Sequence, residues 1–251
     1  MRELFRHSIN RETLHVPIAQ ETALYLGKTI ALIIPARNEA LTLPCVLKAV
    51  PEEVDRVVVV DNGSTDDTHR VAEKHCAQVV REPRKGYGRA CLAGLSAQEA
   101  DPPDIVAFAD ADGSDDLSRL IEFIDLVANE EADLALARRV PVEPKALTHQ
   151  QRFGNWLATR LIRLFWGHDY KDLGPMRAIT WDGLQRLNMA DTSYGWTVEM
   201  QVKALQKGLR ATELPVPYLR RKAGRSKVSG TLVGSLLAGV KILRVIFREI
   251  R

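Results

Sequence analysis

Two patterns of hydrophobic and polar positions alternate along the first half of the chain. Near-continuous apolar runs occur at Thr29–Pro35, Val57–Val60 and Ile105–Ala109, as expected for strands buried in a parallel sheet. Shorter strand patterns occur at Ala77–Val80 and Asp133–Ala137. Between these strands, apolar residues recur at helical spacing and predict four helices. Their approximate ranges are 41–50, 64 or 65 to 75, 90–99 and 117–129. This alternation predicts an α/β fold with a doubly wound, mostly parallel sheet.

The second half of the chain is less regular. Gln151–Trp166 and Thr231–Arg251 have amphipathic helix patterns, and Trp196–Gln206 predicts a third helix. Asp172–Ile179 predicts a loop followed by a short strand, and Leu214–Leu219, which holds two prolines, predicts an edge or irregular strand. The pattern divides the chain into an N-terminal extension (1–27), a main domain (28–231) and a C-terminal basic amphipathic helix (232–251).

The apolar stripes of the two amphipathic helices have several possible partners. One stripe includes Phe153, Trp156 and Phe165, and the other includes Leu236 and Phe247. Stripes of this kind most often pack in a core or a dimer interface, but the basic residues beside them also suit an anionic membrane surface. No run reaches about 18 uncharged apolar residues, so the sequence predicts no membrane span.

Polar clusters follow the three longest strand patterns directly. The third cluster is Asp110-Ala111-Asp112, in which one small residue separates two carboxylates. Because parallel strands of an open α/β sheet end at one rim, and ligands bind at that rim, these clusters are expected to meet. Two carboxylates at positions i and i+2 of a strand end can face one Mg²⁺ or Mn²⁺ ion, which usually shares its shell with substrate phosphates. Outside this context, the same residues are common in turns and helix caps.

Composition adds three limits. Lys and Arg number 35 against 32 Asp and Glu, a net charge of +3, so a nucleic acid partner is not predicted. The segment after residue 220 is strongly basic, which suits phosphates or an anionic membrane surface. The three cysteines form no C-x-x-C pair, and the N-terminus has no signal-peptide pattern. We therefore expect a cytoplasmic protein, with peripheral contact to the inner face of a membrane as an option.

The order of the motifs resembles the family 2 glycosyltransferases of the GT-A (Rossmann-like) fold. The first four matching segments are Ile34–Glu39, Val60–Asp66, Lys85–Gly88 and Asp110–Asp112. Two further segments, Asp172–Ala178 and Arg225–Gly230, are similar to the branch of dolichol-phosphate mannose synthases and polyprenyl-phosphate hexose synthases. Each motif is weak alone, and their shared order carries the resemblance over about residues 29–231.

The resemblance implies roles on the donor side. Pro35, Ala36, Asn38, Glu39 and Asp61 would surround the base and ribose of a nucleotide sugar. Lys85 and Gly88 would lie near the base or the diphosphate, and Asp110 and Asp112, with Ala111 between them, would hold the metal. Arg225, Ser226 and Lys227 would close over the diphosphate, whose charge must be neutralised before it can leave. Asp61 could also simply begin a turn with the Asn and Gly that follow it.

On the acceptor side the sequence leaves more alternatives. Glu199 lies where the family carries an acceptor-side acid. It would act as a base for a hydroxyl acceptor, or it would instead position the sugar or form a salt bridge with an arginine. Arg138 and Arg152 match residues that would bind an acceptor phosphate, although Arg152 could be part of a solvated helix face. Arg177 would contact phosphate or brace its loop. Ser114 departs from the branch pattern, because a Gln at that position can join the metal shell.

The leading hypothesis is an inverting, metal-dependent transferase that moves a hexose from a UDP- or GDP-sugar to a polyprenyl phosphate. A second hypothesis keeps the enzyme class and changes the acceptor to a soluble or protein-bound hydroxyl. A third, prompted by Ser114 alone, is a nucleotide-sugar-binding protein without transfer activity. The donor base, the sugar and the oligomeric state, including a homodimer, stay open.

Overall fold

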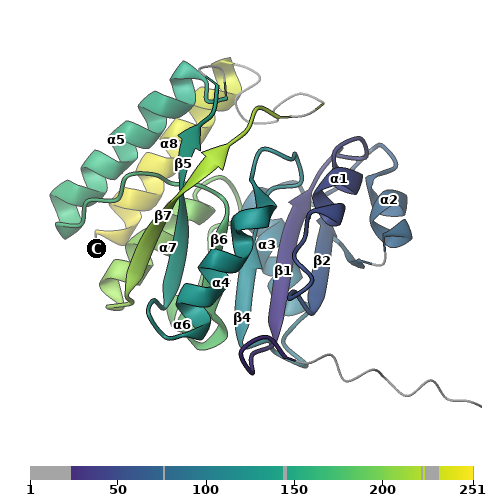
Figure 1. Cartoon of the computed structure of the whole chain (residues 1–251). Coiled ribbons are helices and arrows are strands. Elements are labelled where there is room, and N and C mark those ends of the chain that lie inside the picture. The colour runs from purple at the N-terminus through teal and green to yellow at the C-terminus, as the bar shows by residue number, and fades with distance from the viewer. Residues whose placement is uncertain (1–23, 76, 144–145, 222, 224–231, 251) are drawn as a thin grey trace, which may run out of the picture.

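A computed structural model describes residues 24–75, 77–143, 146–221, 223 and 232–250. Seven strands form one sheet in the order β3-β2-β1-β4-β6-β5-β7 (Figure 1). The strands are β1 (Ile30–Ala36), β2 (Arg56–Asp61), β3 (Gln78–Arg81), β4 (Ile105–Phe108), β5 (Leu134–Pro141), β6 (Arg177–Thr180) and β7 (Ala211–Tyr218). All pairs are parallel except those that β6 makes with β4 and β5. The predicted α/β fold with a mostly parallel GT-A sheet is therefore confirmed.

Helices cover both faces of the sheet. One face packs against α1 (Leu43–Lys48), α2 (Thr68–Lys74) and α4 (Leu120–Ala128), the last preceded by a short 3₁₀ turn, η1 (Leu117–Arg119). The core on the other face includes residues of α3 (Tyr87–Ser96), α6 (Trp181–Leu187) and α7 (Trp196–Gln206), and α5 (His149–Trp166) and α8 (Leu232–Glu249) join it by packing on α7 and on each other. Alternate strand residues feed two separate cores, as the two-residue period of a strand requires. Ile33 lies in one core and Ile34 in the other.

Several expected boundaries differ from the structure. The first helix begins at Leu43, with Pro44 in its first turn, so it is shorter than the predicted Leu41–Val50. The second begins at Thr68 rather than after Ser64, because Ser64 and Asp66 form hydrogen bonds within the preceding loop instead of capping a helix. The helix α6 was missed, since the apolar spacing of its seven residues is too short to stand out.

Of the alternatives given for the stripe of α5, packing in the core of the chain does not apply to Phe153 and Trp156, and the dimer and membrane alternatives stay open. The buried residues of α5 are Ala158 and Ile162, whereas Phe153 and Trp156 are exposed. Leu236 lies on a part of α8 whose side chains are outside the described residues. Within the described ranges, no helix is both long and apolar enough to cross a membrane.

Candidate active site

A cavity of about 440 Å³ lies at the carboxyl ends of β1 and β4. These neighbouring strands are where the order of the sheet reverses, the position at which open α/β sheets bind ligands. Pro35, Ala36, Glu39 and Lys85 line the cavity from the donor side, as predicted. Asp110, Ala111 and Asp112 line it at the end of β4, so the structure brings these seven predicted residues together.

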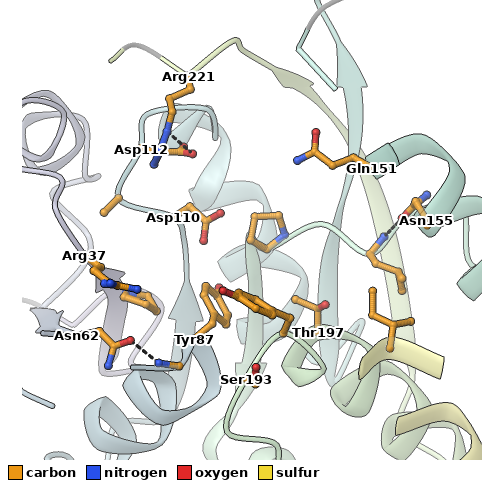
Figure 2. Close-up of a pocket in the computed structure, with 18 of the residues that line it drawn as sticks. Arg37, Asn62, Tyr87, Asp110, Asp112, Gln151, Asn155, Ser193, Thr197 and Arg221 are labelled. Atoms are coloured by element: carbon orange, nitrogen blue, oxygen red, sulfur yellow. Dashed lines mark hydrogen bonds and ion pairs between the residues drawn. The ribbon is translucent and has the colours of Figure 1, made fainter. Parts of the chain in front are cut away.

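Asp110 and Asp112 line the cavity at the end of β4 (Figure 2), and a third carboxylate, Asp115, lies close to them but is not one of the residues that line it. Oδ2 of Asp115 accepts a hydrogen bond of 3.1 Å from the backbone N–H of Asp110, and its Oδ1 is buried without a hydrogen-bond partner among the described residues. Burial, together with the negative charges of Asp115 and Asp112, raises the pKa of Asp110 well above its ordinary value. Burial raises the pKa of Asp115 to about 7. The site therefore has an excess of negative charge that a divalent cation would relieve.

The metal-binding prediction fits this arrangement. The described residues contain no group of three or more His, Cys, Asp or Glu placed to hold a metal. Two carboxylates suit Mg²⁺ or Mn²⁺ when substrate phosphates complete the shell. A guanidinium already occupies the edge of the site, because Nε of Arg221 lies 3.3 Å from Oδ2 of Asp112 and another of its nitrogens pairs with Glu39. Asp112 is thus placed to bind a cation.

Ser114, the position that departs from the branch pattern, orients Asp112. Its backbone N–H and its hydroxyl both donate to Oδ1 of Asp112, the former at 2.9 Å. The Ser114 hydroxyl also lies 3.1 Å from the hydroxyl of Tyr218 on β7. The side chain is buried beside the carboxylate, so it fixes one oxygen and leaves the other toward Arg221.

Asn62 shapes the donor side of the cavity. Its side-chain amide donates to the carbonyls of Glu82 and Arg84, at 3.0 and 2.8 Å, and its Oδ1 accepts from the N–H of Gly86 at 2.8 Å. These three bonds hold the loop that carries Lys85. Asp61, one residue earlier, accepts from the N–H of Ser64 at 2.9 Å and does not line the cavity. The turn interpretation therefore describes Asp61 in this structure.

Asn38 and Gly88 support the cavity from behind its wall. Asn38 has a positive φ of 52° and joins two loops, since its N–H donates to Ser64 Oγ and its Oδ1 accepts from Thr65 N–H. The N–H of Gly88 donates to the carbonyl of Ser193 at 3.2 Å. A Cβ at Gly88 would overlap the carbonyl oxygen of Asp191, so only glycine permits this approach.

Arg139, rather than the predicted Arg138, reaches the cavity from β5. Successive strand residues face opposite sides, so only one of the two arginines can point inward. Asp172 accepts from Arg139 through both carboxylate oxygens, at 2.7 and 2.8 Å, and the guanidinium lies 5.1 Å from the ring centre of Tyr218. Burial alone would lower the pKa of Arg139, but the bonds and charge of Asp172 hold the pKa above its usual value. Arg139 is a fixed cation.

Arg177 and Glu199 lie outside the cavity. Arg177 is fully buried and donates to the carbonyls of Gly174, Pro175 and Thr197, so it braces the loop before β6. Glu199 is also fully buried and accepts from the N–H of Asp191 at 2.7 Å.

Glu199 also binds two cations on the helices around it. It pairs with Lys203 at 2.9 Å and with Arg248 of α8 at 2.7 Å. Because backbone N–H groups and two ion pairs engage its carboxylate, the alternative in which Glu199 pairs with an arginine describes it better than the base alternative. Arg152 is exposed on α5 and does not line the cavity. Arg225, Ser226 and Lys227 lie outside the described residues.

Sequence reasoning missed several residues that line the cavity. Arg37 and Asn62 stand inside motifs that the sequence analysis quoted, and Nε of Arg37 is buried without a hydrogen-bond partner among the described residues. Arg221 lies beyond β7, and no local pattern marked it. Gly86, Tyr87, Leu173 and Pro175 also stand inside quoted motifs. The others come from the second half of the chain: Gln150, Gln151, Gly154, Asn155, Ser193, Tyr194, Thr197, Tyr218, Gly239 and Ile242.

The fold and this site define a glycosyltransferase of the GT-A type. The model of the family described as glycosyl transferase family 2 matches residues 31–179, and the chain belongs to that family. An uncharacterized glycosyltransferase of Mycobacterium tuberculosis is 41% identical over 223 residues, covering 88% of this chain and 99% of that protein. The undecaprenyl-phosphate mannosyltransferase of Micrococcus luteus is 30% identical, covering 84% of this chain and 92% of that protein.

A solved structure has the same fold. Glucosyl-3-phosphoglycerate synthase from Mycobacterium tuberculosis, in complex with Mn²⁺, UDP and glucosyl-3-phosphoglycerate, superposes with a TM-score of 0.72 at 22% identity. The match covers 89% of this chain and 80% of that one. At this identity the likeness shows the fold alone, and the substrates of the chain are argued from its own residues.

Proposed function

We propose that the protein transfers a hexose from a UDP- or GDP-sugar to a polyprenyl phosphate, with inversion at the anomeric carbon, at the cytoplasmic face of a membrane. A phosphate oxygen of the acceptor attacks the anomeric carbon as the bond to the nucleoside diphosphate breaks. The nucleoside diphosphate leaves with the electron pair of that bond. An acceptor phosphate is already an anion, so the reaction needs no base.

One observation carries the choice of acceptor. All the carboxylates that line the described cavity, Glu39, Asp110 and Asp112, lie on the donor side. The residues that line it from β5 onward include Arg139, amides and hydroxyls, but no carboxylate among those described. A hydroxyl acceptor would call for a general base within hydrogen-bond reach, whereas a phosphate would call for a cation. This distribution of charge favours the phosphate.

The donor side fits a nucleoside diphosphate. Asp110 and Asp112 would hold Mg²⁺ or Mn²⁺, and the metal would neutralise charge on the leaving diphosphate. Arg37, Lys85 and Arg221 surround the same space and would bind further diphosphate oxygens. The basic segment with Arg225, Ser226 and Lys227 would add to this set. Positive charge placed where the leaving group develops negative charge is a large source of catalysis.

The relatives support the same class of acceptor. The Micrococcus luteus relative is named for mannosyl transfer to undecaprenyl phosphate, and a Haloferax volcanii relative, 28% identical, is named a dolichyl-phosphate hexose transferase. A soluble hydroxyl acceptor, and a nucleotide-sugar-binding protein without transfer activity, are the competing functions. Transfer to a hydroxyl would need a base, and no carboxylate lines the acceptor side of the described cavity. The binding-protein hypothesis was prompted by Ser114, whose N–H donates to Asp112 and so orients that carboxylate.

The test is a transfer assay with Mg²⁺ or Mn²⁺, a panel of UDP- and GDP-sugars, and a polyprenyl phosphate in detergent. Sugar entering the organic phase with one donor, and lost in Asp112→Asn, is expected. Asp116→Asn is the matched control, because Asp116 caps the η1 turn outside the main cavity and Asn preserves that cap. Nucleotide release without lipid product would move the acceptor to a soluble hydroxyl. Donor binding without transfer or hydrolysis would leave only a binding protein.

A further inference from the structure

Two neighbouring helices expose large apolar side chains on the surface of the molecule. On α5, Leu164 is 73% exposed, Phe153 62% and Trp156 55%. On α8, Phe247 is 54% exposed and Val240 48%. Phe165 and Phe247 meet edge to face, with ring centres 6.2 Å apart, so the two exposed surfaces adjoin. The α5–α8 face is defined here as Phe153, Trp156, Leu164, Phe165, Val240 and Phe247.

Packing among the described residues does not account for this surface. The sides of the helices that face the core bury Ala158 and Ile162 of α5 and Val245 and Ile246 of α8. The larger aromatic residues point outward instead. Large apolar side chains that are exposed side by side on a protein surface mark sites of contact with a protein or a membrane. Some apolar partner is therefore expected.

The charges on the two helices select the kind of partner. Helix α5 contains Arg152, Arg160 and Arg163 and no Asp or Glu, and α8 contains Lys241, Arg244 and Arg248 with Glu249 as its only acid. Some of these cations have acidic neighbours: Arg163 faces Asp169 at 3.7 Å, Lys241 pairs with Asp191, and Arg248 pairs with Glu199 and Glu249. A net positive charge surrounds the apolar side chains.

Two arginines lie within the apolar stripes themselves. Arg160 lies one helical turn from both Trp156 and Leu164, and Arg244 lies one turn from Val240. Arginine can reach outward past apolar neighbours to lipid phosphates, and Trp favours the boundary between headgroups and acyl chains. A second copy of the chain would present the same positive charge, which disfavours a dimer through this face.

The two helices that carry this face also contribute residues to the candidate active site. Gln151, Gly154 and Asn155 of α5 line the cavity, as do Gly239 and Ile242 of α8. Figure 1 shows α5 and α8 running side by side at one end of the molecule, and Figure 2 shows Gln151 and Asn155 across the cavity from Asp110. The helices that expose the apolar face therefore also form the acceptor-side wall of the cavity.

We propose that the α5–α8 face is a docking surface for an anionic bilayer, which places the cavity beside the lipid headgroups. The apolar side chains enter the boundary between headgroups and acyl chains, and the arginines contact lipid phosphates. The proposal deepens the proposed function and rests on it for the acceptor, but the binding itself needs no acceptor. Its test is therefore made without polyprenyl phosphate.

The experiment measures co-sedimentation of the full chain with vesicles of phosphatidylcholine and phosphatidylglycerol. Phe153→Ser combined with Trp156→Ser is expected to weaken binding by about tenfold or more, because interfacial binding scales with buried apolar area. Leu41→Ser is the matched control, since Leu41 is 80% exposed and lies outside the α5–α8 face. Arg160→Gln with Arg244→Gln is expected to weaken binding to anionic vesicles only, and high salt should reduce that difference.

Tryptophan fluorescence provides a second measurement. Brominated acyl chains are expected to quench the wild-type emission, and the quenching should fall in Trp156→Phe. Because the substituted side chains are exposed, circular dichroism should show that all variants stay folded.

The proposal is overturned if wild type does not bind the vesicles, or if Leu41→Ser weakens binding as much as the paired substitution on α5. A concentration-dependent dimer that the same pair dissolves, without vesicle binding, would assign the face to a second copy. Transfer to polyprenyl phosphate in detergent without vesicle binding would overturn the docking surface and leave the proposed function. Vesicle binding without any lipid product would support the docking surface and overturn the proposed function.

Discussion

Arg221 and Asp112 form an ion pair at the mouth of the candidate metal site. Nε of Arg221 lies 3.3 Å from Oδ2 of Asp112, and the same guanidinium pairs with the buried carboxylate of Glu39. Arg221 follows β7, an edge strand, whereas Asp112 follows β4, which is central in the sheet. The guanidinium of Arg221, which comes from the far edge of the sheet, therefore neutralises Asp112, a carboxylate that would otherwise bind a divalent cation.

Replacing Arg221 should separate metal binding from turnover. In Arg221→Gln the competing cation is gone, so the affinity for Mn²⁺ should rise by about tenfold or less, in line with the modest value of a partly exposed ion pair. Turnover should fall by about tenfold or more, because one cation of the diphosphate set is lost. Calorimetry and the transfer assay measure the two effects, and Arg220→Gln, an exposed neighbour, is the control. Unchanged metal affinity would show that the ion pair does not compete.

Metal binding should weaken in mildly acidic solution. Burial raises the pKa of Asp115 to about 7, and burial with the charges of Asp115 and Asp112 raises the pKa of Asp110. A metal at Asp110 and Asp112 displaces the proton of Asp110 and also favours the ionised form of the neighbouring Asp115, so its affinity should fall as the pH drops through about 7, where Asp115 gains its proton.

Asp115→Asn tests this origin of the pH dependence. Removing one negative charge lowers the pKa of Asp110, so the fall in Mn²⁺ affinity should move to lower pH. The Asn oxygen can still accept from the N–H of Asp110. Calorimetric titrations of wild type and variant over a pH series make the comparison, and coincident profiles would contradict the role of Asp115.

Changes at Glu199 should lower stability more than catalysis. Glu199→Gln keeps acceptors for the N–H groups of Ala190 and Asp191 but loses the charge that faces Lys203 and Arg248. The free energy of unfolding should fall by about 2 kcal/mol, and by about 3 kcal/mol or more in Glu199→Ala. Transfer by the Gln variant, assayed where it is folded, should stay within about threefold of wild type. A loss of about a hundredfold would be the result expected of a general base.

Gly88→Ala should damage the donor side of the cavity. The added Cβ would overlap the carbonyl oxygen of Asp191, so the loop that carries Ser193 must move away from α3. Melting temperature should fall and the KM for the donor should rise. Gly154→Ala is the contrasting variant, because a Cβ there meets no atom within 4 Å and Ala favours a helix by up to about 1 kcal/mol. Equal stability losses in the two variants would contradict this explanation.

The donor half of the site was largely predictable, because its chemistry sits directly after strands. Asp110 and Asp112 follow β4, and Pro35, Ala36 and Glu39 lie at or just after the end of β1, so strand patterns placed them at one rim. Because β1 and β4 pair directly, the residues at their carboxyl ends lie next to each other. A local sequence pattern is enough to predict a site residue when only a short turn separates that residue from the end of a strand.

The residues from the second half of the chain were harder to predict, because they are positioned by contacts distant in sequence. Arg139 is selected over Arg138 by its bonds to Asp172, which lies on a different segment. Arg221 is held by Glu39 and Asp112 from the first half of the chain. Glu199 stands where the family has an acid, but its carboxylate forms ion pairs with Lys203 of α7 and Arg248 of α8. A composition or spacing pattern carries no information about such partners.

The reversed direction of β6 has a consequence for how the molecule can change. It separates one block of parallel strands, β3-β2-β1-β4, from a second parallel pair, β5 and β7. Each block has its own parallel hydrogen-bond pattern, and the two blocks are joined by β6, which is antiparallel to both β4 and β5. The donor-side residues belong to the first block and the acceptor-side wall to the elements around the second. Changes in the elements around β5 and β7 are therefore expected to reshape the cavity wall opposite Asp110 while the parallel ladder of β3-β2-β1-β4 stays in place.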